Sequence, residues 1–156
     1  MQAKGGGCML ITSFSHGIDA KGRIFIPAKW REELGETVFI TQGILGNNNE
    51  SCLFGMSQAS WQAFAGRFSN LPITDTMAQS FRRMLFSTAA ECELDKQGRI
   101  LVPNSLREYA GLQKDAMLVG VDTHFEIWAP EIWSLHKQSM EAEYNKAIER
   151  LAQLGI

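Results

Sequence analysis

Residues 15–35 read SHGIDAKGRIFIPAKWREELG, and residues 92–111 repeat the same pattern as CELDKQGRILVPNSLREYAG. At a shift of 76 positions, seven residues between positions 19 and 32 are identical, and two pairs are conservative apolar exchanges, Ile18 with Leu94 and Ile26 with Val102. The identical pairs are Asp19/Asp95, Gly22/Gly98, Arg23/Arg99, Ile24/Ile100, Pro27/Pro103, Arg31/Arg107 and Glu32/Glu108. The chain therefore contains an internal repeat, and we interpret each copy as one structural unit.

Each copy has the pattern of a tight turn followed by a strand and a short helix. In Asp-x-x-Gly-Arg the glycine takes positive φ at low cost, and the aspartate can bond the backbone two residues on. Ile24 and Ile26 then point to one side of a strand, while Arg23 and Phe25 point to the other. Pro27 suits the first position of a helix. We therefore expect a strand, a turn, a strand and a short helix in each copy.

The segments outside the repeat extend this plan. Runs of β-branched and apolar residues predict strands at residues 37–41, 52–54, 117–119 and 125–128. Helices are expected at residues 57–68, after an N-cap at Asp75, and at residues 131–154, the last as one long terminal helix. The predicted domains are two βα halves at 9–75 and 91–135, a helical connector at 76–90, a C-terminal helical extension at 136–156, and a flexible or added leader at 1–8.

The expected fold class is α+β, mainly β. Each half is too small, at roughly 50 residues, to bury a core comfortably alone. Two halves folded against each other as an internal pseudo-dimer solve this problem. Edge strands left open by one pair can be covered by another copy, so a symmetric ring is a natural expectation.

Composition restricts the function classes. The 156 residues are 45% hydrophobic with a net charge of −2, which is not typical of a membrane-surface protein or a generally basic DNA binder. No apolar run approaches the length of a membrane span. Three cysteines at scattered positions favour reduced thiols over a disulfide framework.

No catalytic or metal-binding pattern stands out. His16, His124 and His136 lack neighbouring ligands at metal-site spacing. Cys92 is flanked by two glutamates, which should raise the pKa of its thiol and disfavour a nucleophilic role. We expect no enzyme activity, metal or cofactor.

Positive charge is concentrated in the two copies of the repeat. The cations outnumber the acidic residues by three in residues 16–31 and by two in residues 95–107. They are Lys21, Arg23, Lys29 and Arg31 in the first copy and Lys96, Arg99 and Arg107 in the second. Such side chains on a turn can neutralise phosphates and bind guanine edges. Each arginine can equally pair with its own aspartate to hold the turn, and the pattern alone leaves both interpretations open.

The two stretches IDAKGRIFIPAKWREELG and LDKQGRILVPNSLREYAG, with AAECELD at residues 89–95, resemble the MraZ family of bacterial transcriptional regulators. The resemblance runs from residue 9 to about residue 135 and includes the CLF…W and FEIW…W segments. The loop at residues 47–49 and the first eight residues depart from the family pattern. The resemblance implies an AbrB-like swapped-hairpin fold.

The resemblance also implies a function. We expect a sequence-specific DNA-binding regulator, a repressor, that acts as a ring-shaped homo-oligomer on repeated boxes in the promoter of the division and cell-wall gene cluster. Such a protein works in the cytoplasm at the nucleoid. Its expected partners are double-stranded DNA and further copies of itself, without a membrane or a small-molecule substrate. The alternative is an oligomeric protein-interaction scaffold that docks through the terminal helix at residues 131–154.

Carried over by position, the family's site falls on the two turns. The DNA-contacting residues are Lys21, Arg23, Lys96 and Arg99, and the residues that orient the motif are Asp19, Gly22, Asp95 and Gly98.

Overall fold

The computed structural model describes residues 9–44 and 51–156. The expected leader at 1–8 and the departing loop at 47–49 lie outside the described residues. The first half contains β1 (Ser13–Gly17), β2 (Arg23–Phe25), α1 (Ala28–Leu34), β3 (Thr37–Gln42), β4 (Leu53–Met56) and α2 (Gln58–Gly66). After α3 (Thr76–Thr88) come β5 (Ala90–Glu93), β6 (Arg99–Leu101), α4 (Asn104–Tyr109), β7 (Asp115–Val121), β8 (His124–Trp128), α5 (Pro130–Ala142) and α6 (Tyr144–Gln153).

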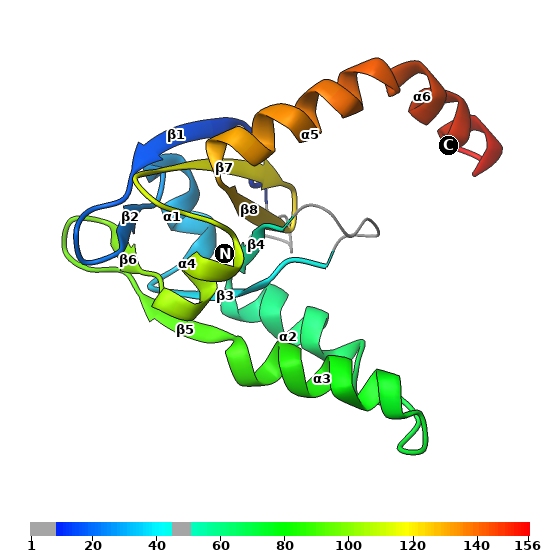
Figure 1. Cartoon of the computed structure of the whole chain (residues 1–156), viewed down its shortest axis with the longest axis horizontal. Helices are drawn as coiled ribbons and strands as arrows, with labels where there is room; N and C mark the ends of the chain where they lie inside the picture. The colour runs from blue at the N-terminus through cyan, green and yellow to red at the C-terminus, as the bar shows by residue number, and fades with distance from the viewer. Residues whose placement is uncertain (1–8, 45–50) are drawn as a thin grey trace, which may run out of the picture.

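The two halves exchange their first strands. The main sheet has the order β1-β7-β8-β4-β3-β5, and every neighbouring pair in it is antiparallel. Strand β1 of the first half pairs with β7 of the second, and β5 of the second half pairs with β3 of the first. The halves also meet directly where β4 pairs with β8 (Figure 1). The chain is therefore a tandem swapped-hairpin pseudo-dimer, and the predicted fold class is confirmed.

A second, two-stranded sheet joins the repeated motifs themselves. Strands β2 and β6 pair antiparallel, with Ile24 opposite Ile100, Arg23 opposite Leu101, and Phe25 opposite Arg99. We call this pair the β2–β6 ribbon. Ile24 and Ile100 are fully buried, so the ribbon turns one face to the core and the other outward.

The main core lies beneath this ribbon. Ile26, Val102, Trp30 and Leu106 pack there with the inner residues of the ribbon, so both short helices α1 and α4 contribute to one cluster. Burial of each large side chain contributes about 1.5–3 kcal/mol. The predicted alternation holds, and Pro27 lies one residue before the expected position, as the N-cap of α1.

Two helical arms leave the sheet from equivalent places. Helix α2 follows β4 and leads into α3, and α5 follows β8 and leads into α6 (Figure 1). Asp75 caps α3 as predicted, with its Oδ1 accepting the N–H of Ala78 at 3.0 Å. A second cluster beneath the arms contains Phe54, Met56 and Trp128.

The prediction of one long terminal helix is wrong, because the helix ends at Ala142 and restarts at Tyr144. The residue between them, Glu143, has φ −108° and ψ 10°, outside the helical range. The helical spacing of apolar residues continues in the sequence from α5 into α6. A break at a single residue leaves that spacing unchanged, so the sequence pattern did not show it. In the described parts of the chain, no helix has the length and apolar character needed to cross a membrane.

Candidate nucleic-acid interface

Each repeated turn is built around its aspartate. Asp19 Oδ1 accepts the backbone N–H groups of Lys21 and Arg23, both at 2.9 Å, and Oδ2 accepts Arg23 Nε at 2.6 Å. Gly22 closes the turn by donating its N–H to the Asp19 carbonyl at 2.9 Å. Its φ of +90° explains why glycine occupies this position.

The second turn repeats these bonds. Asp95 Oδ1 accepts the N–H groups of Gln97 and Arg99, and Oδ2 accepts Arg99 Nε, all at 2.9 Å. Gly98 has φ +82°. The two copies of Asp-x-x-Gly-Arg therefore form the same structure, in which the carboxylate fixes the backbone and the arginine together.

The hydrogen bonds change the acidity of both carboxyl groups. The backbone N–H of Arg23 lowers the pKa of Asp19 from 3.8 to about 2, helped by the Arg23 side chain and opposed by partial desolvation. The Arg99 backbone and side chain lower the pKa of Asp95 in the same way. Both groups are therefore anionic at neutral pH and hold their arginines by charge-assisted bonds.

Arg99 also lies close to the turn of the first copy. Arg99 Nη1 stands 3.6 Å from Asp19 Oδ2, so this arginine contacts the aspartates of both copies. The side chains of Arg23 and Arg99 remain 30% and 20% exposed. A guanidinium has five N–H donors, and its bond to the aspartate through Nε leaves others for a second acceptor.

The outer face of the β2–β6 ribbon carries more than the arginines. Phe25 and Leu101 lie on the same face and are 41% and 55% exposed. The Arg99 guanidinium carbon lies 5.8 Å from the centre of the Phe25 ring, within cation–π range. Sequence reasoning missed both apolar residues as site candidates, although strand alternation had already placed Phe25 beside Arg23.

Lys21 and Lys96 are both exposed in the turns. They occupy different positions, because Lys21 aligns with Gln97 and Lys96 aligns with Ala20. The two turns are thus equal in backbone and arginine, and differ in where the lysine stands.

The other repeated arginines, Arg31 and Arg107, contact the backbone of the protein. Arg31 Nε donates to the Ile26 carbonyl at 2.9 Å, and its guanidinium packs so closely on Gly98 that a Cβ there would overlap it. Arg107 packs on Gly22 in the same way. These two arginines of the repeat therefore connect the two halves.

The other titratable residues of the sequence prediction are scattered. His16 lies near the ring of Phe25, and His124 lies near Glu126. Burial raises the pKa of the Cys92 thiol to about 11, so the predicted direction is right, while the cause is burial and not the flanking glutamates. Within residues 9–44 and 51–156, no three potential metal ligands of the His, Cys, Asp and Glu types form a group.

Comparison with known proteins agrees with the doubled architecture. The family model of the MraZ protein, antitoxin-like by its description, matches twice, at residues 9–84 and 85–154. "Transcriptional regulator MraZ" of Carboxydothermus hydrogenoformans is 45% identical over 143 residues, covering 92% of this chain and 96% of that protein. The proteins of the same name from Desulfitobacterium hafniense and Caldicellulosiruptor bescii are 45% and 41% identical over 148 residues, covering 95% of this chain and 100% of theirs. The chain belongs to the MraZ family.

Proposed function

We propose that this protein is a sequence-specific DNA-binding transcriptional regulator whose β2–β6 ribbon contacts the DNA bases. The observation that carries the proposal is the presence of two aspartate-held arginines on the outer face of one two-stranded ribbon. The major groove of B-DNA admits a two-stranded ribbon, and arginine is the commonest specific partner of guanine there. The relatives named as transcriptional regulators support the same conclusion.

The residues of the site have different roles in this proposal. Arg23 and Arg99 contact guanine edges or phosphates, since each is pre-positioned by its aspartate. Lys21 and Lys96 neutralise backbone phosphates. Asp19 and Asp95, with the positive-φ residues Gly22 and Gly98, orient the arginines and do not themselves contact the anionic DNA.

Phe25 and Leu101 add an apolar component to the interface. On the outer face of the ribbon, Phe25 lies opposite Arg99 and Leu101 lies opposite Arg23. Apolar side chains in the major groove contact the methyl group of thymine. The proposed contact surface therefore combines positive charge with an apolar centre, even though the chain as a whole is acidic.

We also propose that the protein acts as a homo-oligomer, a ring, on repeated promoter boxes of the division and cell-wall gene cluster. One ribbon per chain binds weakly, and several ribbons at fixed spacing gain avidity. Exposed apolar residues on α6, namely Tyr144, Ile148 and Leu151, support self-association. Occlusion of the promoter makes the regulator a repressor that works in the cytoplasm at the nucleoid.

The test is binding of the full chain to labelled promoter-box DNA and to a scrambled duplex. Arg23→Ala should weaken binding to the box at least about tenfold, because a charge-assisted contact is lost, and should leave the oligomer mass unchanged. The matched control is Arg82→Ala, which removes an exposed arginine from α3. Equal binding of the wild-type protein to both duplexes would instead favour the protein-interaction scaffold.

A further inference from the structure

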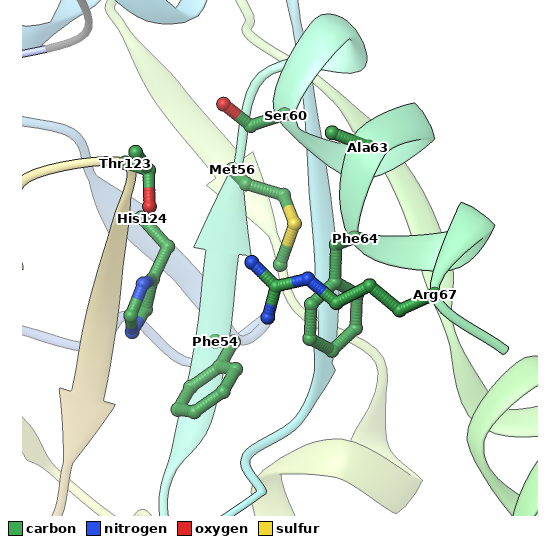
Figure 2. Close-up of a pocket in the computed structure, with 8 residues that line it drawn as sticks. All are labelled: Phe54, Met56, Ser60, Ala63, Phe64, Arg67, Thr123 and His124. Atoms are coloured by element: carbon green, nitrogen blue, oxygen red, sulfur yellow. The ribbon is translucent and has the colours of Figure 1, made fainter.

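A hollow of about 240 Å³ opens between β4, α2 and the turn that joins β7 to β8 (Figure 2). Figure 1 places these elements on the other side of the molecule from the β2–β6 ribbon. The hollow is therefore separate from the proposed DNA-binding surface. Its volume lies below the range of about 300–1,000 Å³ that is typical of pockets for drug-sized ligands, so an occupant must be small.

The floor of the hollow is apolar and aromatic. Phe54 and Met56 of β4 form its base, and Phe64 of α2 forms one wall. The rings of Phe54 and Phe64 are 6.3 Å apart in an edge-on arrangement, and the imidazole of His124 lies 4.4 Å from the Phe54 ring. Such a floor favours a ring or a compact branched hydrocarbon.

The mouth of the hollow is polar and positively charged. Figure 2 shows the side chain of Arg67 extending from the end of α2 towards β4, with its guanidinium above Phe54 and Met56. Ser60 and Thr123 add further polar side chains to the lining. None of the lining residues is acidic, and within residues 9–44 and 51–156 no carboxylate forms a salt bridge with Arg67.

The imidazole of His124 has a partner on its own strand. Its Nε2 lies 3.4 Å from Glu126 Oε2, and Glu126 Oε1 accepts the indole N–H of Trp128 at 2.9 Å. Glu126 is thereby engaged on its own strand and does not line the hollow. The charge presented to an occupant is that of Arg67.

A competing explanation is that Arg67 only stabilises the end of its helix. It is the C-cap residue of α2, where a cation interacts favourably with the helix dipole. That role requires the charge near the last carbonyl groups and places no demand on an apolar floor. The direction of the side chain in Figure 2, over β4, favours a second role.

We propose that this hollow binds a small carboxylic acid with a compact apolar body, such as an aromatic or branched-chain acid. The guanidinium of Arg67 pairs with the carboxylate, for which its planar fork is suited. Phe54, Met56 and Phe64 contact the body of the acid. An inorganic phosphate would leave this floor unused, and a larger ligand would exceed the volume.

The test uses the full chain and three probes in NMR titrations: benzoate, the neutral isostere benzamide, and inorganic phosphate. We expect saturable binding of benzoate, with binding of benzamide and phosphate weaker by about tenfold or more. Benzamide lacks the carboxylate that pairs with Arg67, and phosphate lacks the apolar body that contacts the floor. Equal binding of benzoate and benzamide, or no saturable binding of benzoate, would overturn the proposal.

Two variants complete the test. Arg67→Gln should weaken benzoate binding by at least about tenfold, whereas Arg82→Gln on α3 should leave it unchanged. A thermal unfolding curve of Arg67→Gln measures any helix-end effect separately from binding. Unchanged benzoate binding in Arg67→Gln would contradict the proposal. Tighter binding of a peptide ending in phenylalanine than of benzoate would identify a chain terminus as the occupant and would also overturn it.

Discussion

The guanidinium of Arg31 packs against the backbone of Gly98, which belongs to the other copy of the repeat. Its reciprocal is Arg107 on Gly22. Backbone bonds accompany both contacts, because the N–H of Ile26 donates to the Gly98 carbonyl at 2.9 Å and the equivalent bond joins the other copy. Each turn that presents an arginine outward is thus supported from within by an arginine of the opposite half.

Replacement of Gly98 by alanine should therefore destabilise the protein in two ways. The backbone has φ +82°, which costs a residue with a Cβ about 1–2 kcal/mol, and the new methyl group would displace the Arg31 guanidinium. Gly111→Ala is the matched control, since Gly111 has φ +67° and its Cβ would meet only an ordinary contact. Urea unfolding should show a larger loss for Gly98→Ala. Equal losses would mean that the guanidinium contact contributes nothing.

Asp19→Asn should remove a pH-dependent part of the stability. The pKa of Asp19 is lowered from 3.8 to about 2 in the folded protein, so its carboxylate stabilises the fold above about pH 4. That contribution is lost as the pH falls from about 4 to about 2. The difference in unfolding free energy between wild type and Asp19→Asn should therefore shrink over this window. A difference that stays constant from pH 5 to pH 2 would show that the carboxylate charge is unimportant there.

The sequence predicted the fold where each residue acts locally. The positive-φ glycines, the aspartate-held turns and the burial of Ile24 and Ile26 all follow from the repeated motif. The partners of Arg31 could not be predicted in this way, because two copies of the same motif do not reveal whether a side chain packs on its own turn or on the other. The helix break at Glu143 was hidden for a different reason, since apolar spacing continues across it.

The candidate site shows the same limit. Charge, which is visible in sequence, drew attention to the repeated cations, and the resemblance to the MraZ family selected Arg23 and Arg99 among them. The cross-strand pairing of Phe25 with Arg99 depends on the register of two strands from different halves. No local pattern encodes that register, so the apolar part of the ribbon surface was found only in the structure.

Lys21→Ala should weaken DNA binding without changing which sequence is preferred. Lys21 is exposed in the first turn and is proposed to contact phosphate. Loss of one phosphate contact should reduce the slope of log affinity against log salt concentration by about 1 for each ribbon engaged. Fluorescence anisotropy at several salt concentrations measures this slope. Lys146→Ala on α6 is the control, and an unchanged slope in Lys21→Ala would exclude Lys21 from the interface.

Phe25→Ser should affect DNA binding in the opposite way to Lys21→Ala, by changing sequence preference and not salt dependence. The exposed ring contacts the Arg99 guanidinium and, in the proposed complex, the apolar edge of the bases. Its removal should lower affinity for the promoter box while leaving the salt slope unchanged, because no phosphate contact is lost. Tyr109→Ser serves as the control, since Tyr109 is 39% exposed and lies on α4. Equal loss of affinity for box and scrambled DNA would argue against base contact by Phe25.

Charge introduced on the apolar side of α6 should reduce the size of the proposed oligomer. Ile148 and Leu151 are 49% and 45% exposed and lie three residues apart, on one face of the helix. A buried glutamate at an interface costs more free energy than a typical contact supplies, so Ile148→Glu should lower the native mass. Lys146→Glu, on the same helix but outside this face, changes charge without touching the apolar residues. If both variants keep the wild-type mass in native mass spectrometry, α6 does not join the subunits, and its exposed face is left to the binding of other proteins.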